Sequence, residues 1–357
     1  MPDATLGRLR LVAQGLVDRP FARPSDAVAA FGAMQGQDLP GVIASAALRS
    51  TGSAADVIDD LGAARIVRGY PMRGTVFFLP GADALWITEL CARPSITAAS
   101  SRRRDLDESH VERVLELSQE ALAGGPLPRA QLFGAWRAGG IATDEGRGYH
   151  LLFHLIARGL VCYGPWNGAD QSVVLTDHWL PAGSGLEGRF GGDRVPATAE
   201  LLRRYFVSHG PATVRDFAWW TKLPLSQIRA ALALVEGQLE TDGADEPSYW
   251  APGLRERADD LGRGASAPVL LPGFDEFILG YQDRLFAMTA EQHHRLVPGN
   301  NGVFKPSIVQ GGQVRGLWRR GGRPGRRSLE VDEFGPLSPT ARKRLDRLFG
   351  EFPFPLP

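Results

Sequence analysis

The feature that most constrains the fold is a local pattern of two helices followed by two short strands. Residues 128–138 and 146–158 have helical apolar periodicity, and Gly139-Gly140 separates them. Two β-like runs follow, at 160–163 and 172–175, joined by a connection rich in turn formers. A unit this small buries only a small core, so a chain of 357 residues is expected to combine several such units.

A similar pattern returns between residues 197 and 243. A helix is expected at 199–209, Gly210-Pro211 breaks it, and Thr213 is placed to cap the next helix. A third helix and the start of a strand follow. Helix, turn, helix and hairpin together make the winged-helix pattern, in which the second helix can enter a major groove and the hairpin can contact the backbone.

The rest of the chain predicts further helices and a β-rich end. Helices are expected at 5–16, 25–34, 54–67, 82–92 and 339–349, and strands at 74–79, 269–271, 277–279, 303–310 and 313–318. Segments 183–194 and 252–268 read as irregular connections. The fold class is therefore α+β, mainly helical, with three tandem winged-helix units and a C-terminal β-rich element. The expected boundaries are 1–120, 121–183, 195–250 and 265–357.

Composition indicates a soluble globular protein, with 43% hydrophobic and 22% charged residues. No apolar run approaches the roughly 18 residues that span a bilayer, and the N-terminus does not resemble a signal peptide. Cys91 and Cys162 lie far apart, which supports neither a disulfide framework nor a zinc site. We expect a cytoplasmic protein, associated with the bacterial nucleoid through DNA, with no membrane partner and no cofactor.

The basic residues are almost all arginine. Forty basic residues balance forty acidic ones, and lysine occurs only at Lys222, Lys305 and Lys343. Arginine presents a planar fork suited to phosphates and base edges, and several arginines gather between 319 and 327. A neutral protein with such local clusters can bind nucleic acid through one face, although charge runs are also typical of solvated surface.

Motifs of common enzyme classes are absent from the sequence: no GxSxG, HExxH or P-loop occurs. His150 and His154 are four residues apart on a predicted helix, but no carboxylate lies at ligand spacing. We therefore expect no metal site.

Three polar groups stand out instead. The first is Gln35-Gly36-Gln37-Asp38, where a helix ending near Gln35 and a left-handed Gly36 would point both amides into one cavity. The amides would then hold a water or a substrate edge; simple helix capping is the alternative.

The other two groups lie around predicted strands. The first of these groups lies at the start of a strand. Its arginines could bind phosphate and its aromatic ring could stack on a base, but it can equally be a plain loop. Its polar members are Arg68, Tyr70, Arg73 and Thr75. The other flanks an apolar run with carboxylates and an amide, and such density needs a structural or functional reason. Its members are Asp275, Glu276, Gln282 and Asp283.

With these groups, the chain resembles the AlkZ/YcaQ-type winged-helix DNA glycosylases. The resemblance spans nearly the whole chain through ordered blocks of sequence. The blocks are MQGQD at 34–38, PMRGT at 71–75, GRGYHLLFHLIARGLVCYG at 146–164, SHGPATVRDFAWW at 208–220, LPGFDEFILGYQDR at 271–284 and NGVFKPSIVQGGQVRGLWRR at 301–320.

The resemblance implies a glutamine motif carried by Gln35 and Gln37, as in the Gln-x-Gln, AlkZ-like branch. Gly36 stands where relatives usually have a larger apolar residue, and Phe77 where many have histidine, so the lesion preference stays open. The resemblance further implies a monomeric, monofunctional glycosylase that acts on double-stranded DNA with N7-alkylated purines, in repair or self-resistance.

The two glutamines are hypothesised to hold the attacking water, with electrostatic support from Asp38, Asp275 or Asp283. The residues expected to contact DNA are Arg68, Tyr70, Arg73, Thr75, Arg284, Trp318, Arg319 and Arg320.

Two other functions remain open from the sequence. One is a non-enzymatic winged-helix regulator that binds DNA. The other is a resistance protein that sequesters a planar drug on a tryptophan-rich surface formed by Trp219, Trp220, Trp250 and Trp318.

Overall fold

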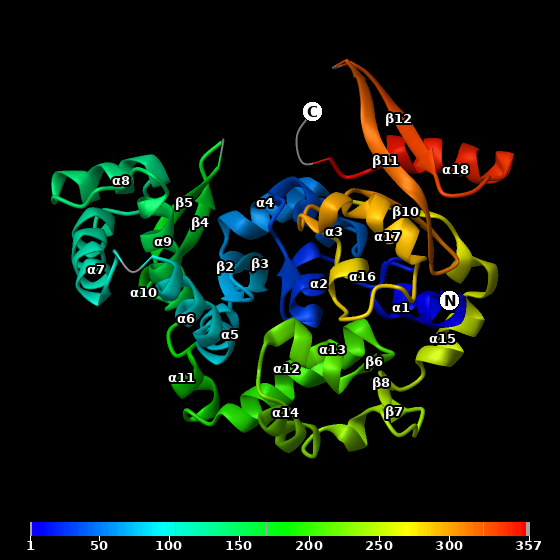
Figure 1. Ribbon diagram of the computed structural model, residues 1–357, viewed down its shortest axis with the longest axis horizontal. Helices are drawn as coiled ribbons and strands as arrows, with labels where there is room; N and C mark the ends of the chain where they lie inside the picture. Colours follow the sequence, from blue (N-terminus) through cyan, green and yellow to red (C-terminus); the bar gives the residue numbers. More distant parts are fainter. Residues whose placement is uncertain (1, 104, 169, 324, 355–357) are drawn as a thin grey trace.

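The computed structural model describes residues 2–103, 105–168, 170–323 and 325–354 (Figure 1). The N-terminal part is mostly helical, with three strands. Its elements are α1 (Ala4–Ala13), α2 (Pro24–Phe31), β1 (Met34–Gln35), α3 (Leu39–Leu48), α4 (Ala54–Gly62), β2 (Ile66–Met72), β3 (Thr75–Pro80), α5 (Ala84–Cys91), α6 (Arg93–Arg102) and α7 (Glu108–Leu122).

The second part has the predicted helices and hairpin. It contains α8 (Arg129–Ala138), α9 (Arg147–Ala157), β4 (Val161–Trp166) and β5 (Gln171–Leu175). Gly159, at φ +71°, turns the chain from α9 into the hairpin. Trp136, Leu151 and Leu155 are fully buried in a core of their own, which α7 also covers.

One five-stranded antiparallel sheet runs through both parts, in the order β1-β3-β2-β4-β5. The hairpin β4–β5 joins β2 through the pairing of Arg68 with Tyr163. The first two expected units therefore share a sheet. β1 lies at its edge, with β3 as its neighbour.

The third part follows the hairpin β4–β5. Its elements are α10 (Thr176–Trp179), α11 (Leu186–Phe190), α12 (Arg194–His209), β6 (Ala212–Thr213), α13 (Val214–Thr221), α14 (Leu225–Leu232), η1 (Glu236–Gln238), β7 (Glu240–Thr241) and β8 (Ser248–Trp250). The segment 183–194, expected to be irregular, contains the short helix α11. Thr213 caps α13 as predicted and completes a capping box with Asp216. The three strands form a small sheet in the order β6-β8-β7.

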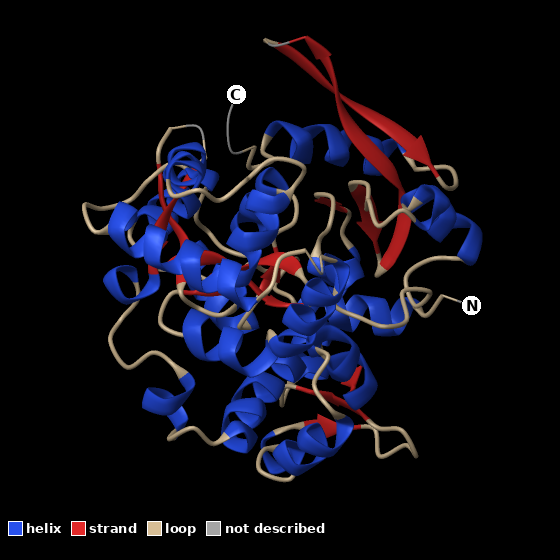
Figure 2. Cartoon of the chain, turned by 60° about the vertical axis from the view of Figure 1, so that its left-hand side comes forward, coloured by secondary structure: helices blue, strands red, loops and turns tan. Residues whose placement is uncertain are grey.

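The C-terminal part carries a four-stranded sheet in the order β12-β11-β10-β9. Its elements are α15 (Leu254–Asp260), η2 (Gly262–Ser266), β9 (Val269–Leu271), α16 (Glu276–Leu279), α17 (Ala290–Leu296), η3 (Pro298–Asn300), β10 (Ser307–Gln310), β11 (Gln313–Arg323), β12 (Arg326–Glu333) and α18 (Pro339–Gly350). Gly311 and Gly312, both at positive φ, make the hairpin turn between β10 and β11, and Ser338 caps α18. The hairpin β11–β12 projects far from the body (Figure 2).

Three further expectations for secondary structure are wrong. Residues 277–279 form a helical turn, because the Asp275 side chain accepts from the Phe277 N–H and caps it. Ile66 and Val67 belong to β2, since α4 ends at Gly62 and β-branched residues suit a strand. The segment expected to be irregular at 252–268 contains α15, whose Leu254 packs into the core with α1.

Candidate functional site

The glutamine motif lies on an edge strand and not at a helix end. α2 already ends at Phe31, where Gly32 takes the positive φ of +76° that was expected at Gly36. Gly36 instead pairs with β3, donating its N–H to the Val76 carbonyl at 2.8 Å. A Cβ at Gly36 would come within 3.3 Å of the Phe77 backbone, so glycine allows the two strands to approach closely here.

Both amide side chains follow the start of β3. The Gln35 Oε1 accepts from the Thr75 hydroxyl, and the Gln37 Oε1 accepts from the Val76 N–H, each at 3.4 Å. Gln35 is buried, with 8% exposed, whereas Gln37 is exposed. Neither amide nitrogen donates to any residue that the structure describes. Both amide N–H2 groups are therefore available to donate to a ligand.

Asp38 is half-buried beside the motif, at the N-cap of α3. Burial raises the pKa of this carboxyl above its usual value, although the Gly41 backbone acts in the opposite direction. A Cβ at Gly41 would lie 2.6 Å from Asp38 Oδ2, so this glycine makes room for the carboxylate.

Asp275 is a fully bonded, buried carboxylate. Arg49 donates to both of its oxygens, and Ser45 and the Phe277 N–H supply two further hydrogen bonds. Burial by itself would raise the pKa of Asp275, but the charge and hydrogen bonds of Arg49 outweigh it and hold the pKa below its usual value. Its oxygens are thus committed to holding α3 against the 275–279 turn.

Glu276, the next residue, is the group that reaches the motif itself. It is 1% exposed, and its Oε1 accepts from the Gln35 backbone N–H at 2.6 Å. Its Oε2 lies 3.4 Å from Nε2 of the buried His209. Sequence reasoning included Glu276 in the acidic group but did not place it in the site.

The loop of predicted DNA contacts divides into two places. Arg73 and Thr75 lie beside the glutamine motif, since Thr75 bonds Gln35 and Arg73 lies over the ring of Phe77 at 5.2 Å. Arg68 and Tyr70 instead face the second part of the chain. Arg68 lies over the Tyr163 ring at 5.0 Å, and the Tyr70 ring packs edge-on to Phe153.

Burial accounts for the titration behaviour of this loop. It lowers the pKa of Arg73 to about 10 and also lowers the pKa of Arg68. Burial also raises the pKa of Tyr70, so this phenol stays protonated at neutral pH.

Three cations converge on one indole ring next to the motif. Arg73, Arg284 and Lys222 lie 4.7, 5.0 and 5.4 Å from the centre of the Trp219 ring. Burial lowers the pKa of each cation, and Arg73 further lowers that of Lys222. We call these four residues the Trp219 cluster.

The cations of the Trp219 cluster lack anionic partners. Among the described residues, none of the three forms an ion pair, and Arg73 Nη2 and Arg284 Nε are buried with no hydrogen-bond partner. Arg73 and Lys222 both adopt positive φ, +58° and +63°, which is uncommon for residues other than glycine. A partly buried group of like charges without anionic partners suits an anionic ligand.

The remaining predicted contacts lie elsewhere. Asp283 is exposed and accepts from the Leu285 N–H. Trp318 is 6% exposed, donates to the Leu271 carbonyl and packs on Phe352, so it is a core residue and does not offer a stacking face. This burial argues against the stacking role in DNA binding that the sequence suggests for Trp318.

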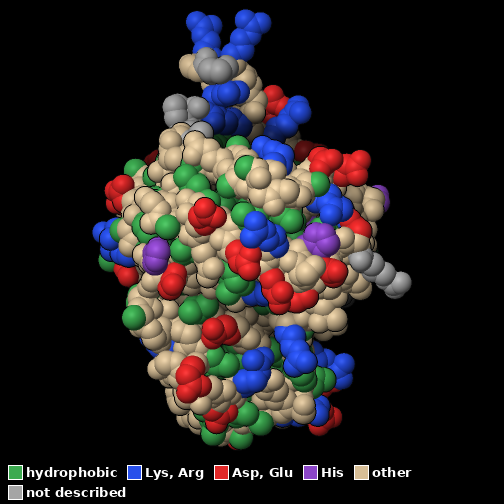
Figure 3. All heavy atoms as spheres, turned by 90° about the vertical axis from the view of Figure 1, so that its left-hand side faces the viewer, with side chains coloured by type: hydrophobic (Ala, Val, Ile, Leu, Met, Phe, Trp, Pro, Cys, Tyr) green, Lys and Arg blue, Asp and Glu red, His purple; other side chains and the backbone are tan. Residues whose placement is uncertain are grey.

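The last two predicted contacts lie on β11. Arg319 is exposed and forms an ion pair with Glu330, whereas Arg320 is half-buried over the Phe354 ring. The hairpin continues past them to exposed arginines near its end, and Figure 3 shows basic side chains at the tip of the projection. These exposed residues are Arg323, Arg326 and Arg327.

The tryptophans do not form a common surface. Trp220, Trp250 and Trp318 are buried, at 0%, 3% and 6% exposure, and only Trp219 is half-buried. A tryptophan-rich face for stacking a planar drug is therefore absent from the described chain.

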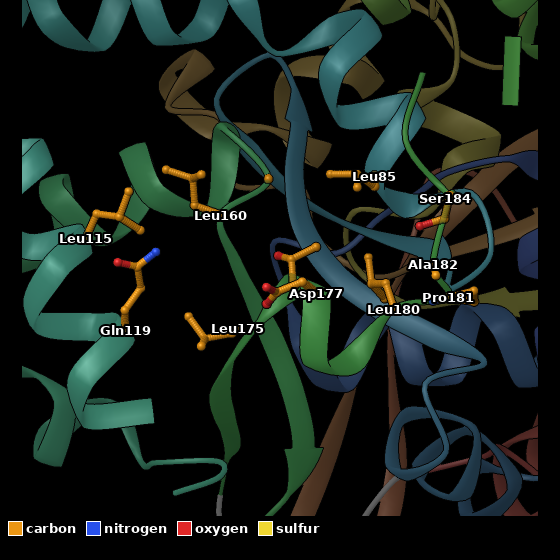
Figure 4. A pocket seen from close by; sticks show the side chains of 13 residues that line it. Leu85, Leu115, Gln119, Leu160, Leu175, Asp177, Leu180, Pro181, Ala182 and Ser184 are labelled. Carbon is orange, nitrogen blue, oxygen red and sulfur yellow. The ribbon is translucent and has the colours of Figure 1, made fainter. Parts of the chain in front are cut away.

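A separate cavity of about 360 Å³ is lined by residues of α5, α7 and α10 and by both ends of the β4–β5 hairpin (Figure 4). Leucines from several elements line it, among them Leu85, Leu160 and Leu175, with Asp177 at its side. The glutamine motif and the Trp219 cluster contribute none of its described lining.

Two general features complete the description. In the described ranges, no helix is both long and apolar enough to cross a membrane. Nor do three or more metal-ligating side chains gather anywhere in the part of the chain that the structure describes.

Comparison with known proteins identifies the relatives of this chain. A family model described as DNA glycosylase AlkZ-like matches residues 28–352. The interstrand DNA cross-link repair glycosylase of Streptomyces sahachiroi is 28% identical over 277 residues, which cover 71% of this chain and 70% of the relative. The solved structure of the S. sahachiroi DNA glycosylase AlkZ has the same fold, with a TM-score of 0.75 at 20% identity and 98% coverage of both chains.

Proposed function

This chain belongs to the AlkZ-like DNA glycosylase family, and we propose that it hydrolyses the N-glycosidic bond of N7-alkylated purines in double-stranded DNA. The observation that carries the proposal is the pair of amides, Gln35 and Gln37, held along β3 with both N–H2 groups unengaged by described residues.

The chemistry needs only a modest site. Alkylation at N7 gives the purine a positive charge, which already weakens its bond to the sugar. The enzyme must position a water at the anomeric carbon and stabilise an oxocarbenium-like transition state. Two amides on one strand edge offer both donors and acceptors, so Gln35 and Gln37 orient this water.

The carboxylates have different roles in this scheme. Asp38, half-buried beside the glutamines, is the candidate for electrostatic support of the developing cation. Asp275 has its oxygens engaged by Arg49, Ser45 and a backbone N–H, so it supports the site by fixing α3. Asp283 is exposed and bonded to its own turn, which gives it no part in the chemical step.

DNA is held by the Trp219 cluster and the β11–β12 hairpin. A phosphate beside the lesion supplies the anion that Arg73, Lys222 and Arg284 lack in the free protein. The exposed arginines at the end of the hairpin extend this contact along the backbone. The helix pair and hairpin formed by α8, α9, β4 and β5 support a winged-helix contact in the second part.

Bulky lesions, including interstrand cross-links, fall within the proposed substrate range. The curated relative from S. sahachiroi carries cross-link repair in its name. Gln37 is exposed in the bend that follows the edge strand β1. A large adduct can therefore reach the motif without full extrusion into a tight cavity.

The experiment is to incubate the protein with duplex DNA containing N7-methylguanine and to quantify the released base. We expect release by the wild type and a loss of about 100-fold or more in Gln35→Ala and Gln37→Ala, in line with removal of a transition-state donor. Gln292→Ala, which removes the side-chain amide that accepts from the Thr289 N–H at the start of α17, is the control. Sequence-specific binding without release would instead identify a regulator.

A second measurement tests whether the enzyme is monofunctional. Lys222 lies in the Trp219 cluster and is the amine that would form a Schiff base in a lyase. We expect no protein–DNA adduct on borohydride reduction, because release proceeds by attack of water. An adduct that disappears in Lys222→Gln would contradict the hydrolytic mechanism.

A further inference from the structure

The carboxylate of Glu276 is a buried charge without a usual partner. Its side chain is 1% exposed, yet it forms no ion pair with a lysine or arginine in the described chain. Its two contacts are the Gln35 backbone N–H, 2.6 Å from Oε1, and His209 Nε2, 3.4 Å from Oε2. Burying a carboxylate in this way is costly, so the arrangement needs a reason.

The first contact provides a hydrogen-bond acceptor for the unpaired side of the edge strand β1. Among the described strands, β1 pairs with β3 alone, and the next residue, Gly36, donates its N–H to the Val76 carbonyl. The Gln35 N–H points to the other side, towards Glu276. A buried N–H with no acceptor would be unfavourable. The Glu276 carboxylate takes the place that a further strand would occupy, and thereby fixes the main chain of Gln35.

The second contact is made to the imidazole of His209, whose Nε2 lies 3.4 Å from Glu276 Oε2. The other ring nitrogen, Nδ1, lies 2.9 Å from the Ser208 hydroxyl, which also donates to the Arg204 carbonyl at 2.7 Å. The imidazole is therefore held through both ring nitrogens, and it holds the carboxylate in turn.

The surroundings hold this pair in one position. The Tyr205 ring stacks on His209 at 4.4 Å, and Phe31 packs edge-on to it at 5.0 Å. On the far side, a Cβ at Gly280 would lie 2.5 Å from the imidazole, which leaves no room for movement. The charged and titratable groups that face the pair from neighbouring elements are Arg10, Arg49, Arg73, Tyr205, Asp216 and Tyr281.

We propose that Glu276, supported by His209, is a positioning residue that fixes the Gln35 main chain, and through it the catalytic amide. The inference rests on the proposed glycosylase function. It assigns the buried residues Glu276 and His209 a part in the site. Glu276 acts through Gln35 and does not contact the substrate. Its effect is therefore expected on the chemical step and not on DNA affinity.

Two substitutions of similar size separate the hydrogen bond from the charge. Glu276→Met fills the same space without an acceptor and removes a buried carboxylate, so the protein is expected to fold. Glu276→Gln keeps the acceptor for the Gln35 N–H and places its amide N–H2 beside His209 Nε2. Leu152→Ala, in the separate core of the second part, is the control for general destabilisation.

The measurement is the single-turnover rate of N7-methylguanine release, together with the Kd for the same duplex. We expect E276M to release base about 100-fold more slowly with an unchanged Kd, because small misplacements of a catalytic group cost rates of this order. E276Q should stay within about tenfold of the wild type. The backbone amide proton of Gln35 should resonate at low field in the wild type and in E276Q, and shift upfield in E276M.

The proposal is overturned if E276M is as fast as the wild type, or if E276Q is as slow as E276M. In the second case the negative charge, and not the hydrogen bond, would be what the reaction needs. A wild type that releases no base would contradict the proposed function instead. The amide resonance would then decide on its own whether Glu276 fixes Gln35.

Discussion

Arg49 donates two parallel hydrogen bonds to Asp275, of 2.9 and 2.8 Å, and both side chains are almost completely buried. The same guanidinium donates to Gln14 at 2.7 Å, and Gln14 in turn donates to the Tyr281 hydroxyl. These bonds join α1, α3 and the 275–281 segment directly behind the glutamine motif. The pair therefore sets the framework on which Gln35 and Glu276 meet.

Removing one partner of this pair should be strongly destabilising. Arg49→Leu leaves the Asp275 carboxylate buried without its cation, which typically costs about 3–5 kcal/mol in the free energy of unfolding. Urea denaturation at neutral pH measures the loss. Arg113→Leu is the matched control, because its ion pair with Glu116 is exposed and is expected to contribute less than about 1 kcal/mol. Equal losses in the two variants would contradict the assigned role of the buried pair.

The same pair predicts a dependence of stability on acid. The pKa of Asp275 is lower in the folded protein than in the unfolded chain, where it lies near 3.9. Its contribution is therefore complete above about pH 4 and is lost as the pH falls through the folded pKa. Urea denaturation of the wild type and Asp275→Asn should show a difference in stability that shrinks between pH 7 and pH 3. If the stability difference between the wild type and Asp275→Asn instead grew on acidification, the pKa of Asp275 would be raised by folding, which would contradict the prediction.

His154 predicts a second acid response, at higher pH. Burial lowers its pKa from 6.5 to about 4, with His150 and Arg158 adding to the effect. The unfolded chain takes up this proton first, so stability should fall as the pH decreases from about 6.5 towards 4. His154→Phe should flatten that slope in a series of thermal melts, whereas His178→Phe, an exposed control, should leave it unchanged.

The Trp219 cluster predicts opposite effects on stability and on DNA binding. Arg284→Gln relieves repulsion from Arg73 and Lys222, so the Tm of the free protein should stay the same or rise. DNA affinity should fall, and the slope of log Kd against log salt should decrease by about one. Fluorescence anisotropy over a range of salt concentrations measures both quantities. A lower Tm with an unchanged slope would indicate a structural role for the cluster.

Trp318 should matter for stability and not for stacking on DNA. Its ring packs on Phe352 and Phe354 and its indole N–H bonds the Leu271 carbonyl. Trp318→Ala should cost about 3–5 kcal/mol, as for other large buried aromatics. Binding measured on the folded fraction should match the wild type. A selective loss of affinity without loss of stability would restore the role expected from the sequence.

Local sequence patterns predict many of the helices and turns of the fold. Thr213, Ser338 and the Gly311-Gly312 turn each determine their own element through a cap or a positive φ, and all three were predictable. The turn at 277–279 was not, because a short apolar run that is buried on all sides has no periodicity that separates strand from helix. There the Asp275 side chain decides the structure.

The candidate site was predictable in its composition and less so in its geometry. Gln35 and Gln37 were recognisable as amides between apolar segments. Either Gly32 or Gly36 could have ended α2, and the helix ends at Gly32. The meeting of Gln35 with Glu276 joins residues 241 positions apart. No local pattern reports such a contact, and the same holds for Lys222 and Arg73 on Trp219.

The shared sheet also bears on how the chain can be divided. β4 covers the free edge of β2 through the pairing of Arg68 with Tyr163, across the boundary that the sequence suggests near residue 120. A fragment ending there would leave β2 with an uncovered edge, and such edges recruit strands from other molecules. Truncation at this point would therefore favour self-association, and the second part protects the first from aggregation.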